Sequence, residues 1–245
     1  MDENALVAEQ LRLRDTFLIT DDCPNLNFDP ASLNGLRCVA GVDVSFTSNN
    51  ETAFASACAL SFPDLTLLRS VVIQHDNPAI GYIPGLLGFR EARPCVDALN
   101  ELQSTHVIGC VLVDGNGTLH SRRFGSACHI GVLSGLPTIG VAKNIMCIDG
   151  LNRPYVEHRA TEALCQKGAW ERVYGSSGAE LCALVQATGS SKKPAIVSQG
   201  HRFSLSTSAR IAAHCMHFKT PEPIRAADMA SRKALARAST NTPLP

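Results

Sequence analysis

The chain has 245 residues, of which 22 are lysine or arginine and 22 are aspartate or glutamate, so its formal net charge is zero. Hydrophobic residues make up 45% of it and charged residues 18%. These proportions are typical of a globular protein and exclude a disordered, collagen-like or coiled-coil chain. The neutral total also argues against a protein that coats nucleic acid, because such proteins carry an excess of basic residues.

The charge is nevertheless uneven along the chain. Residues 1–100 hold 6 basic and 13 acidic side chains, whereas residues 201–245 hold 7 basic and 2 acidic ones. A basic segment of this kind is as typical of a solvated helix face as of a surface that binds phosphates. The candidate phosphate contacts in the C-terminal third are Lys192, Lys193, Arg202 and Arg225.

The cysteines and the apolar stretches indicate a reducing compartment and no membrane span. The ten cysteines are never closer than 15 residues, which argues against a site of clustered thiolate ligands. The acidic start, MDENALVAEQ, differs from a signal peptide, and the longest uncharged stretch, residues 124–142, is interrupted by four glycines and a proline. We therefore expect the protein to lie in the cytoplasm and/or nucleus, without membrane association. We also expect it to be a monomer.

The apolar pattern predicts a mixed sheet. After a helix that extends to about residue 20, three apolar runs at residues 36–46, 52–62 and 65–74 are joined by turn-like linkers, which predicts an antiparallel meander. A helix at 86–103, a strand at 107–113, a helix near 126–133 and a strand at 137–141 come next. Strands that are joined through helices should extend the sheet in parallel.

This order of elements is that of ribonuclease H-like folds, so we expect an α/β fold with a central mixed sheet flanked by helices. Strands at 181–187 and 195–198 and helices at 204–218 and 222–238 complete the prediction, whereas residues 144–180 show no clear pattern. No linker divides the chain, so residues 1–245 are predicted to form a single domain.

Acidic residues interrupt two of the apolar strands. Asp43 lies within VAGVDVSF, and Asp114 ends VIGCVLVDGNG. A buried carboxylate is costly unless it is paired, hydrogen-bonded or bound to a metal, and these two with Glu91 from a helix would form an oxygen cluster suited to Mg²⁺. Such a cluster predicts phosphodiester hydrolysis. Two other interpretations stay open: DGNG is also a common turn, and Asp43 could pair with an arginine.

Six motifs, taken together, resemble the endonuclease V family. They are GVDVSF (41–46), YIPGLLGFRE (82–91), VDGNGTLHSRRFGSACHIGV (113–132), PTIGVAKN (137–144), SQGHRFSL (198–205) and TPEPIRAADMASR (220–232). They run in family order along almost the whole chain. The resemblance implies hydrolysis of the second phosphodiester bond 3′ to inosine in single-stranded RNA and/or DNA, with Mg²⁺ or Mn²⁺. The products would carry 3′-hydroxyl and 5′-phosphate ends, and the similarity to eukaryotic members favours RNA.

The resemblance also implies roles for single residues. It assigns metal binding to four carboxylates, Asp43, Glu91, Asp114 and Asp228. It places Lys143 by the scissile phosphate, where a positive charge would stabilise a developing oxyanion. From the residues alone, Asp228 fits a surface ion pair equally well, and Lys143 fits a lysine whose stem covers apolar surface.

The segment Tyr82-Ile83-Pro84-Gly85 resembles the family's wedge, a loop that fills the gap left by a flipped base. Gly81 replaces the proline of the bacterial pattern, which loosens the loop. The flipped base should enter a pocket of backbone groups, where glycine permits close approach. The candidate pocket residues are Gly85, Leu87, Gly115, Gly117, Gly125 and Ser126, and the candidate phosphate or sugar contacts are His120, His129 and His201.

Each of these assignments has a structural alternative. The wedge segment could simply begin the following helix, glycine-rich segments are ordinary turns, and loop histidines are often only exposed. Two other functions also stay open: a non-catalytic module that binds inosine-containing RNA, and a ribonuclease H-like nuclease with specificity for junctions or other structures.

Overall fold

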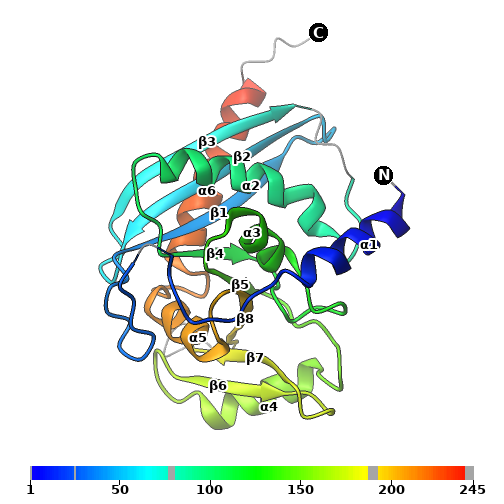
Figure 1. Ribbon diagram of the computed structural model, residues 1–245, viewed down its shortest axis with the longest axis vertical. Helices are drawn as coiled ribbons and strands as arrows, with labels where there is room; N and C mark the ends of the chain where they lie inside the picture. Colours follow the sequence, from blue (N-terminus) through cyan, green and yellow to red (C-terminus); the bar gives the residue numbers. More distant parts are fainter. Residues whose placement is uncertain (1, 25, 77–80, 187–192, 241–245) are drawn as a thin grey trace.

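The computed structural model describes residues 2–24, 26–76, 81–186 and 193–240. In this part of the chain, eight strands form one sheet in the order β3-β2-β1-β4-β5-β8-β7-β6 (Figure 1). The predicted antiparallel meander is confirmed as β1 (Cys38–Phe46), β2 (Thr52–Ser61) and β3 (Leu67–Asp76). The predicted parallel extension is confirmed as β4 (Cys110–Asp114) and β5 (Thr138–Ala142).

The other half of the sheet is antiparallel. β8 (Ala195–His201) pairs with β5, β7 (Glu180–Val185) with β8, and β6 (Trp170–Tyr174) with β7. The stretch without a clear sequence pattern contains β6 and the helix α4 (Arg153–Ala163). Only Val156 and Ala160 of α4 are buried, so its apolar periodicity is too weak to be recognised from sequence.

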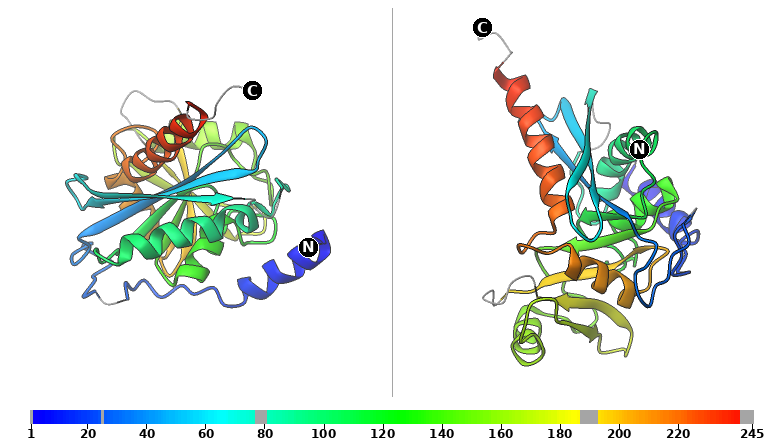
Figure 2. Two further views of the ribbon diagram at one scale, coloured as in Figure 1. Left: turned by 90° about the horizontal axis from the view of Figure 1, so that it is seen from above. Right: turned by 90° about the vertical axis from the view of Figure 1, so that its left-hand side faces the viewer.

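Helices cover both faces of the sheet. α2 (Leu87–Gln103) and α3 (Ser126–Ser134) pack on one face, and α5 (Leu205–His214) and α6 (Glu222–Thr240) pack on the other (Figure 2). Because both faces are buried, the central strands read as continuous apolar runs. In β4, for example, Val111 and Val113 belong to the core under α2 and α3, whereas Leu112 belongs to the core under α5 and α6.

The N-terminal helix α1 (Glu3–Arg14) lies beside α3 and ends earlier than predicted. The residues after it take part in backbone hydrogen bonds with the end of β8: the N–H of Arg202 donates to the carbonyl of Leu18, and Ile19 forms a bridge with Arg202. These contacts come from a distant part of the chain and cannot be read from local spacing.

All ten cysteines are free, and eight of them are buried. Among the helices of the described residues, none is long and apolar enough to cross a membrane.

The close approach of α6 to β1 depends on Gly41. A Cβ atom at this position would lie 2.0 Å from both the carbonyl carbon and the carbonyl oxygen of Pro223, in the first turn of α6. Backbone atoms cannot turn aside as a flexible side chain can, so any other residue here would push α6 away from β1.

We therefore expect Gly41→Ala to lower the free energy of unfolding by about 1–3 kcal/mol, the usual cost of overpacking a core. Urea denaturation followed by circular dichroism measures it. Gly81→Ala is the matched control, because a Cβ there meets no atom of the described residues within 4 Å. Equal stability of the two variants would contradict the role assigned to Gly41.

Candidate active site

The carboxylates gather where β1 extends beyond β4. The parallel register between these strands ends at Val42 and Val113, so Asp43 lies at the point where β1 continues without β4. Val42 packs in the core under α2, and the next residue, Asp43, accepts a hydrogen bond from Ser231 of α6. We call this place, where β1 continues beside the end of β4, the notch. Side chains from α2 on one face of the sheet and from α6 on the other face can extend to it.

Three of the predicted carboxylates line one cavity of about 280 Å³ in this notch: Asp43, Glu91 and Asp114. Burial raises the pKa of Asp43, and the negative charges of Asp228 and Asp114 raise it further. Burial also raises the pKa of Glu91, to about 7, and the charge of Asp43 adds to this rise. The structure therefore brings all four acids close enough for their charges to interact.

Positive side chains neutralise part of this charge. Lys143 Nζ lies 2.6 Å from Asp114 Oδ2, and Arg232 Nε lies 2.7 Å from Asp228 Oδ1. The pairing of Asp228 matches the ion-pair alternative noted from the sequence.

The donor set fits a hard divalent cation in its chemistry. Its members are oxygen ligands. Burial, and then the neighbouring negative charges, raise the pKa of Asp43 and Glu91, and a bound cation would offset this penalty on their charged forms. Within the described residues, no three acidic, histidine or cysteine side chains stand close enough to share one ion as they are placed. Asp43, Glu91 and Asp114, which share the cavity, and Asp228, whose charge acts on Asp43, are the side chains that could hold an ion after side-chain movement.

Ser231 is a site residue that the sequence analysis missed. It is fully buried on α6, and its hydroxyl donates to Asp43 Oδ2. The hydroxyl of Ser45 lies 2.8 Å from that of Ser231, so Ser45, Ser231 and Asp43 form one hydrogen-bonded row. Ser231 follows Asp228 by three residues, so both lie on one face of α6, and this spacing is the signal that could have revealed it.

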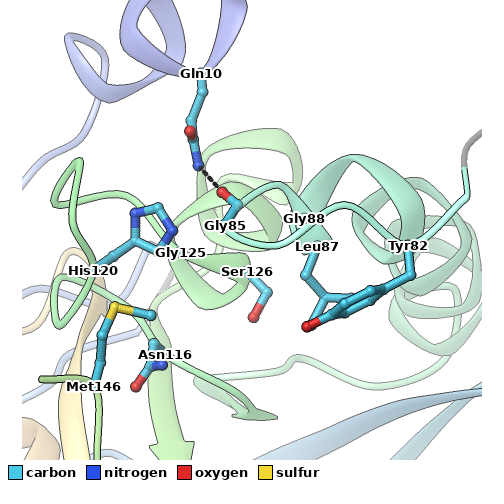
Figure 3. Close-up of a pocket in the computed structure, with 10 residues that line it drawn as sticks. All are labelled: Gln10, Tyr82, Gly85, Leu87, Gly88, Asn116, His120, Gly125, Ser126 and Met146. Carbon is cyan, nitrogen blue, oxygen red and sulfur yellow. Dashed lines mark hydrogen bonds between the residues drawn. The ribbon is translucent and has the colours of Figure 1, made fainter. Parts of the chain in front are cut away.

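A second cavity, of about 170 Å³, adjoins the first (Figure 3). Leu87 lines both cavities, which places them side by side. The second cavity contains six of the predicted substrate-binding residues: Tyr82, Gly85, Leu87, His120, Gly125 and Ser126. It also contains four residues that the sequence analysis missed: Gln10, Gly88, Asn116 and Met146.

The second cavity offers both donors and an acceptor. α2 and α3 begin at it, and neither helix has a side-chain hydrogen bond at its N-cap. The first N–H groups of a helix have no partner within the regular helix and form its positive end. The N–H of Phe89 already donates to the carbonyl of Leu86 and that of Ala127 to the carbonyl of Asn116, so the donors that remain at the cavity in the described structure include those of Gly88 and Ser126. Asn116 Oδ1 is buried without a hydrogen-bond partner in the described part of the chain. This combination suits a planar ring that carries a carbonyl group and an N–H group.

The wedge segment lies at the mouth of this second cavity. The side chain of Tyr82 is 66% exposed, and Figure 3 shows it beside Leu87. Ile83 and Pro84 do not line the cavity. The exposed ring of Tyr82 is therefore the part of the segment that is available to a ligand.

The other two predicted glycines pack beneath the second cavity rather than line it. A Cβ at Gly117 would lie 1.8 Å from the carbonyl oxygen of Gln199, and one at Gly115 would lie 2.4 Å from Ser126 Oγ. Atoms of the protein itself approach both positions closely, and neither glycine lines the cavity where the base was expected.

Two of the predicted histidine contacts are core residues in this structure. His129 and His201 are each 4% exposed. The ring of His129 packs edge-on against Phe89 at 4.6 Å, and His201 Nδ1 accepts a hydrogen bond from the N–H of Leu18. Burial lowers the pKa of each to about 4, so both are neutral at pH 7. The structure does not bring them to either cavity.

The basic C-terminal residues are used in different ways. Arg202 forms a 2.7 Å ion pair with Asp22, and Arg225 forms a 3.1 Å ion pair with Glu222. Lys193 lies in a groove that it shares with Lys143. Lys192 lies outside the described residues. The other basic residues of this groove are Arg153 and Lys219, so four cationic side chains line it and make it a candidate surface for phosphate contacts.

The sequence and the fold are both similar to those of known proteins. The sequence model of the family described as Endonuclease V matches residues 25–229. The endonuclease V of Mus musculus is 40% identical over 237 residues, which cover 94% of this chain and 68% of the mouse protein. The crystal structure of the human protein has a TM-score of 0.87 at 35% identity and covers 97% of this chain and 100% of the human chain.

A further solved structure contains nucleic acid. It is endonuclease V of Ciona intestinalis in complex with a DNA that contains an inosine followed by a ribo-adenosine. Its TM-score is 0.85 at 30% identity, and the match covers 97% of this chain and 99% of that one.

The raised pKa of Glu91 has a consequence for stability. In the absence of divalent ions, stability should fall as the pH rises from 4.5 through about 7, because the folded state must release a proton that it binds more tightly than the unfolded state does. Glu91→Gln should therefore raise the free energy of unfolding at pH 8 by on the order of 2 kcal/mol and have little effect at pH 4. Urea denaturation in EDTA at both pH values measures this.

Glu51→Gln, at an exposed position in the turn between β1 and β2, is the matched control. It should leave the pH dependence of unfolding unchanged. An identical pH dependence in wild type and Glu91→Gln would show that Glu91 is not held in an environment that resists its ionisation.

Proposed function

Because the chain belongs to the endonuclease V family, we propose that it hydrolyses the second phosphodiester bond 3′ to inosine in single-stranded RNA and/or DNA. The products would carry 3′-hydroxyl and 5′-phosphate ends, and we favour RNA because the wedge resembles that of eukaryotic members. The main support for the proposal is that the two cavities meet at Leu87. One is lined by carboxylates, and the other offers hydrogen-bond donors and an acceptor. The inosine-containing DNA bound by the Ciona intestinalis relative supports the substrate class. We further propose that residues 1–245 act as one domain and as a monomer.

We assign the binding of Mg²⁺, or of Mn²⁺ in its place, to Asp43, Glu91, Asp114 and Asp228. A divalent cation bound there would lower the pKa of an attacking water and neutralise charge on the phosphoryl oxygens. Glu91 is the ligand most sensitive to acid, since its pKa is about 7 before any cation offsets the neighbouring charges. Ser231 holds the carboxylate of Asp43 in place through its hydroxyl hydrogen bond.

Lys143 is assigned to the scissile phosphate. Its ammonium group now pairs with Asp114, but its side chain is 55% exposed, and exchange of an exposed ion-pair partner costs little free energy. Once turned toward a phosphate oxygen, it would stabilise the negative charge that develops during hydrolysis.

The second cavity is assigned to the flipped base. Hypoxanthine presents O6 as an acceptor and N1–H as a donor. The N–H groups of Gly88 in α2 and Ser126 in α3 would donate to O6, and Asn116 Oδ1 would accept from N1–H. Adenine has an amino group and an unprotonated N1 at these places, so both contacts would be lost and buried groups left unpaired. Tyr82 would stack in the gap that the base leaves.

His120 lines this cavity as a neutral group. Burial, followed by the charge of Arg122, lowers its pKa to about 4. At neutral pH it can therefore bind sugar or base through a hydrogen bond, but it brings no positive charge to a phosphate.

The central test compares matched single strands that differ only in one inosine or adenosine, as RNA and as DNA, with Mg²⁺. We expect cleavage one nucleotide beyond the inosine, at the second bond on its 3′ side, and none of the adenosine strand, because only hypoxanthine satisfies the pocket. Gel analysis of end-labelled strands measures both, and EDTA should abolish the products.

Other outcomes would favour the alternatives. Binding of inosine strands that is unchanged by EDTA, with no product, would indicate a binding module. Equal cleavage of strands without inosine would indicate a nuclease of different specificity.

Asp43→Ala should lower the cleavage rate by more than about 100-fold, beyond the loss typical of a change next to a metal ligand. The fold should survive, because burial and neighbouring acids already disfavour the charge that the substitution removes. Single-turnover cleavage and circular dichroism measure the two effects. Asp64→Asn, at an exposed turn between β2 and β3, is the control, and near-normal turnover of Asp43→Ala would remove Asp43 from the site.

A further inference from the structure

Helix α1 forms one wall of the second cavity, although it lies before residues 25–229, the part that matches the family model. The wall residue is Gln10, which is only 3% exposed. Its Nε2 donates to the carbonyl of Gly85 at 3.1 Å and to the carbonyl of Phe124 at 2.7 Å. Gly85 lies in the wedge segment before α2, and Phe124 directly precedes the N-cap of α3. One side chain therefore joins the segments on two sides of the cavity.

Arg122 completes this arrangement. Its Nε donates to Oε1 of Gln10, and its Nη2 donates to the carbonyl of Gly85 at 2.7 Å. The amide of Gln10 thus uses both its oxygen and its nitrogen, and the carbonyl of Gly85 accepts from two side chains. We call the side chains of Gln10 and Arg122, with the two carbonyls, the clamp; Figure 3 shows the bond from Gln10 to Gly85.

The clamp holds the chain directly before α2. Gly85 adopts φ +78°, in the left-handed region. Glycine occupies this region about as readily as the regions of negative φ, so the local sequence does not fix the direction of its peptide group. Two residues later α2 begins, and its first N–H groups are the donors assigned to the base. A rotation at Gly85 would change the distance between these donors and the acceptor Asn116 on the other side of the cavity.

We propose that Gln10 and Arg122 are positioning residues that set the width of the base pocket and thereby the discrimination between inosine and adenosine. This inference rests on the proposed function and extends it to a helix outside the matched family region. The clamp does not touch the reacting phosphate. Its contribution is to hold donors and acceptor at the separation that hypoxanthine needs.

The test replaces Gln10 by leucine, which has a similar size but makes none of the three hydrogen bonds. We expect KM for cleavage of the inosine RNA to rise about tenfold or more, since small misplacements of binding groups have effects of this size or larger. The affinity for the matched adenosine RNA, measured by fluorescence anisotropy, should stay unchanged. If the substitution only unfolded part of the protein, fewer binding sites would be available, and binding of the inosine RNA and of the adenosine RNA would fall to the same extent.

Gln10→Glu tests the two hydrogen bonds that the Gln10 nitrogen donates separately from the contact that its oxygen makes with Arg122. A glutamate would keep the contact with Arg122 but place a carboxylate oxygen against the two carbonyls, so KM should stay raised. The matched control is Glu9→Gln on the same helix, because Glu9 forms an ion pair with the exposed Arg12, at 2.7 Å, and does not line the second cavity, so this variant should behave as wild type.

The outcomes distinguish this inference from the proposed function. A wild-type protein that cleaves no inosine strand would overturn the proposed function itself. A wild-type protein that cleaves inosine RNA, together with an unchanged KM in Gln10→Leu or full recovery in Gln10→Glu, would overturn the clamp alone.

Discussion

The site is organised by the burial of negative charges beside one another at one notch in the sheet. Asp43, Glu91 and Asp114 share a cavity, and the burial and mutual repulsion raise the pKa of Asp43 and Glu91. Such an arrangement lowers the stability of the fold, so other contacts must hold it in place. The packing of α2 and α6 on opposite faces of β1 provides that support. Each helix covers part of the core and also carries one acidic residue near the notch, Glu91 on α2 and Asp228 on α6.

The same layout explains why the two cavities are adjacent. α2 begins at the second cavity and carries Glu91 to the first cavity one turn later, and β4 ends at Asp114 just before the loop that contains Asn116. α2, and β4 together with the loop after it, therefore contribute to both cavities. The clamp adds α1 to this arrangement, so a segment from the start of the chain is joined to loops that lie 75 and 114 residues further along.

Much of the fold and part of the site could be predicted from the sequence. The meander and its parallel extension can be read from apolar runs with turn linkers, and Asp43 stands out because a charge in such a run is costly. Lys143 and Asp228 needed the family resemblance, since each fits an ordinary surface role. Of the histidines in the matched motifs, His120 lines the second cavity, whereas His129 lies in the core, where it packs on Phe89. α4 escaped prediction because few of its residues are buried.

Sequence by itself determined the periodicity of the strands and the acidic residues that interrupt them, because both depend on neighbours along the chain. Tertiary structure alone decided which polar residues act together. Gln10, Asn116 and Ser231 are ordinary polar residues in the sequence, and they acquire roles only in the folded chain. Gln10 reaches two distant backbone carbonyls, Ser231 reaches the carboxylate of Asp43, and Asn116 Oδ1 is buried without a partner in the described residues. Most buried polar groups are hydrogen-bonded, and the fold decides which groups are buried and which distant groups they meet.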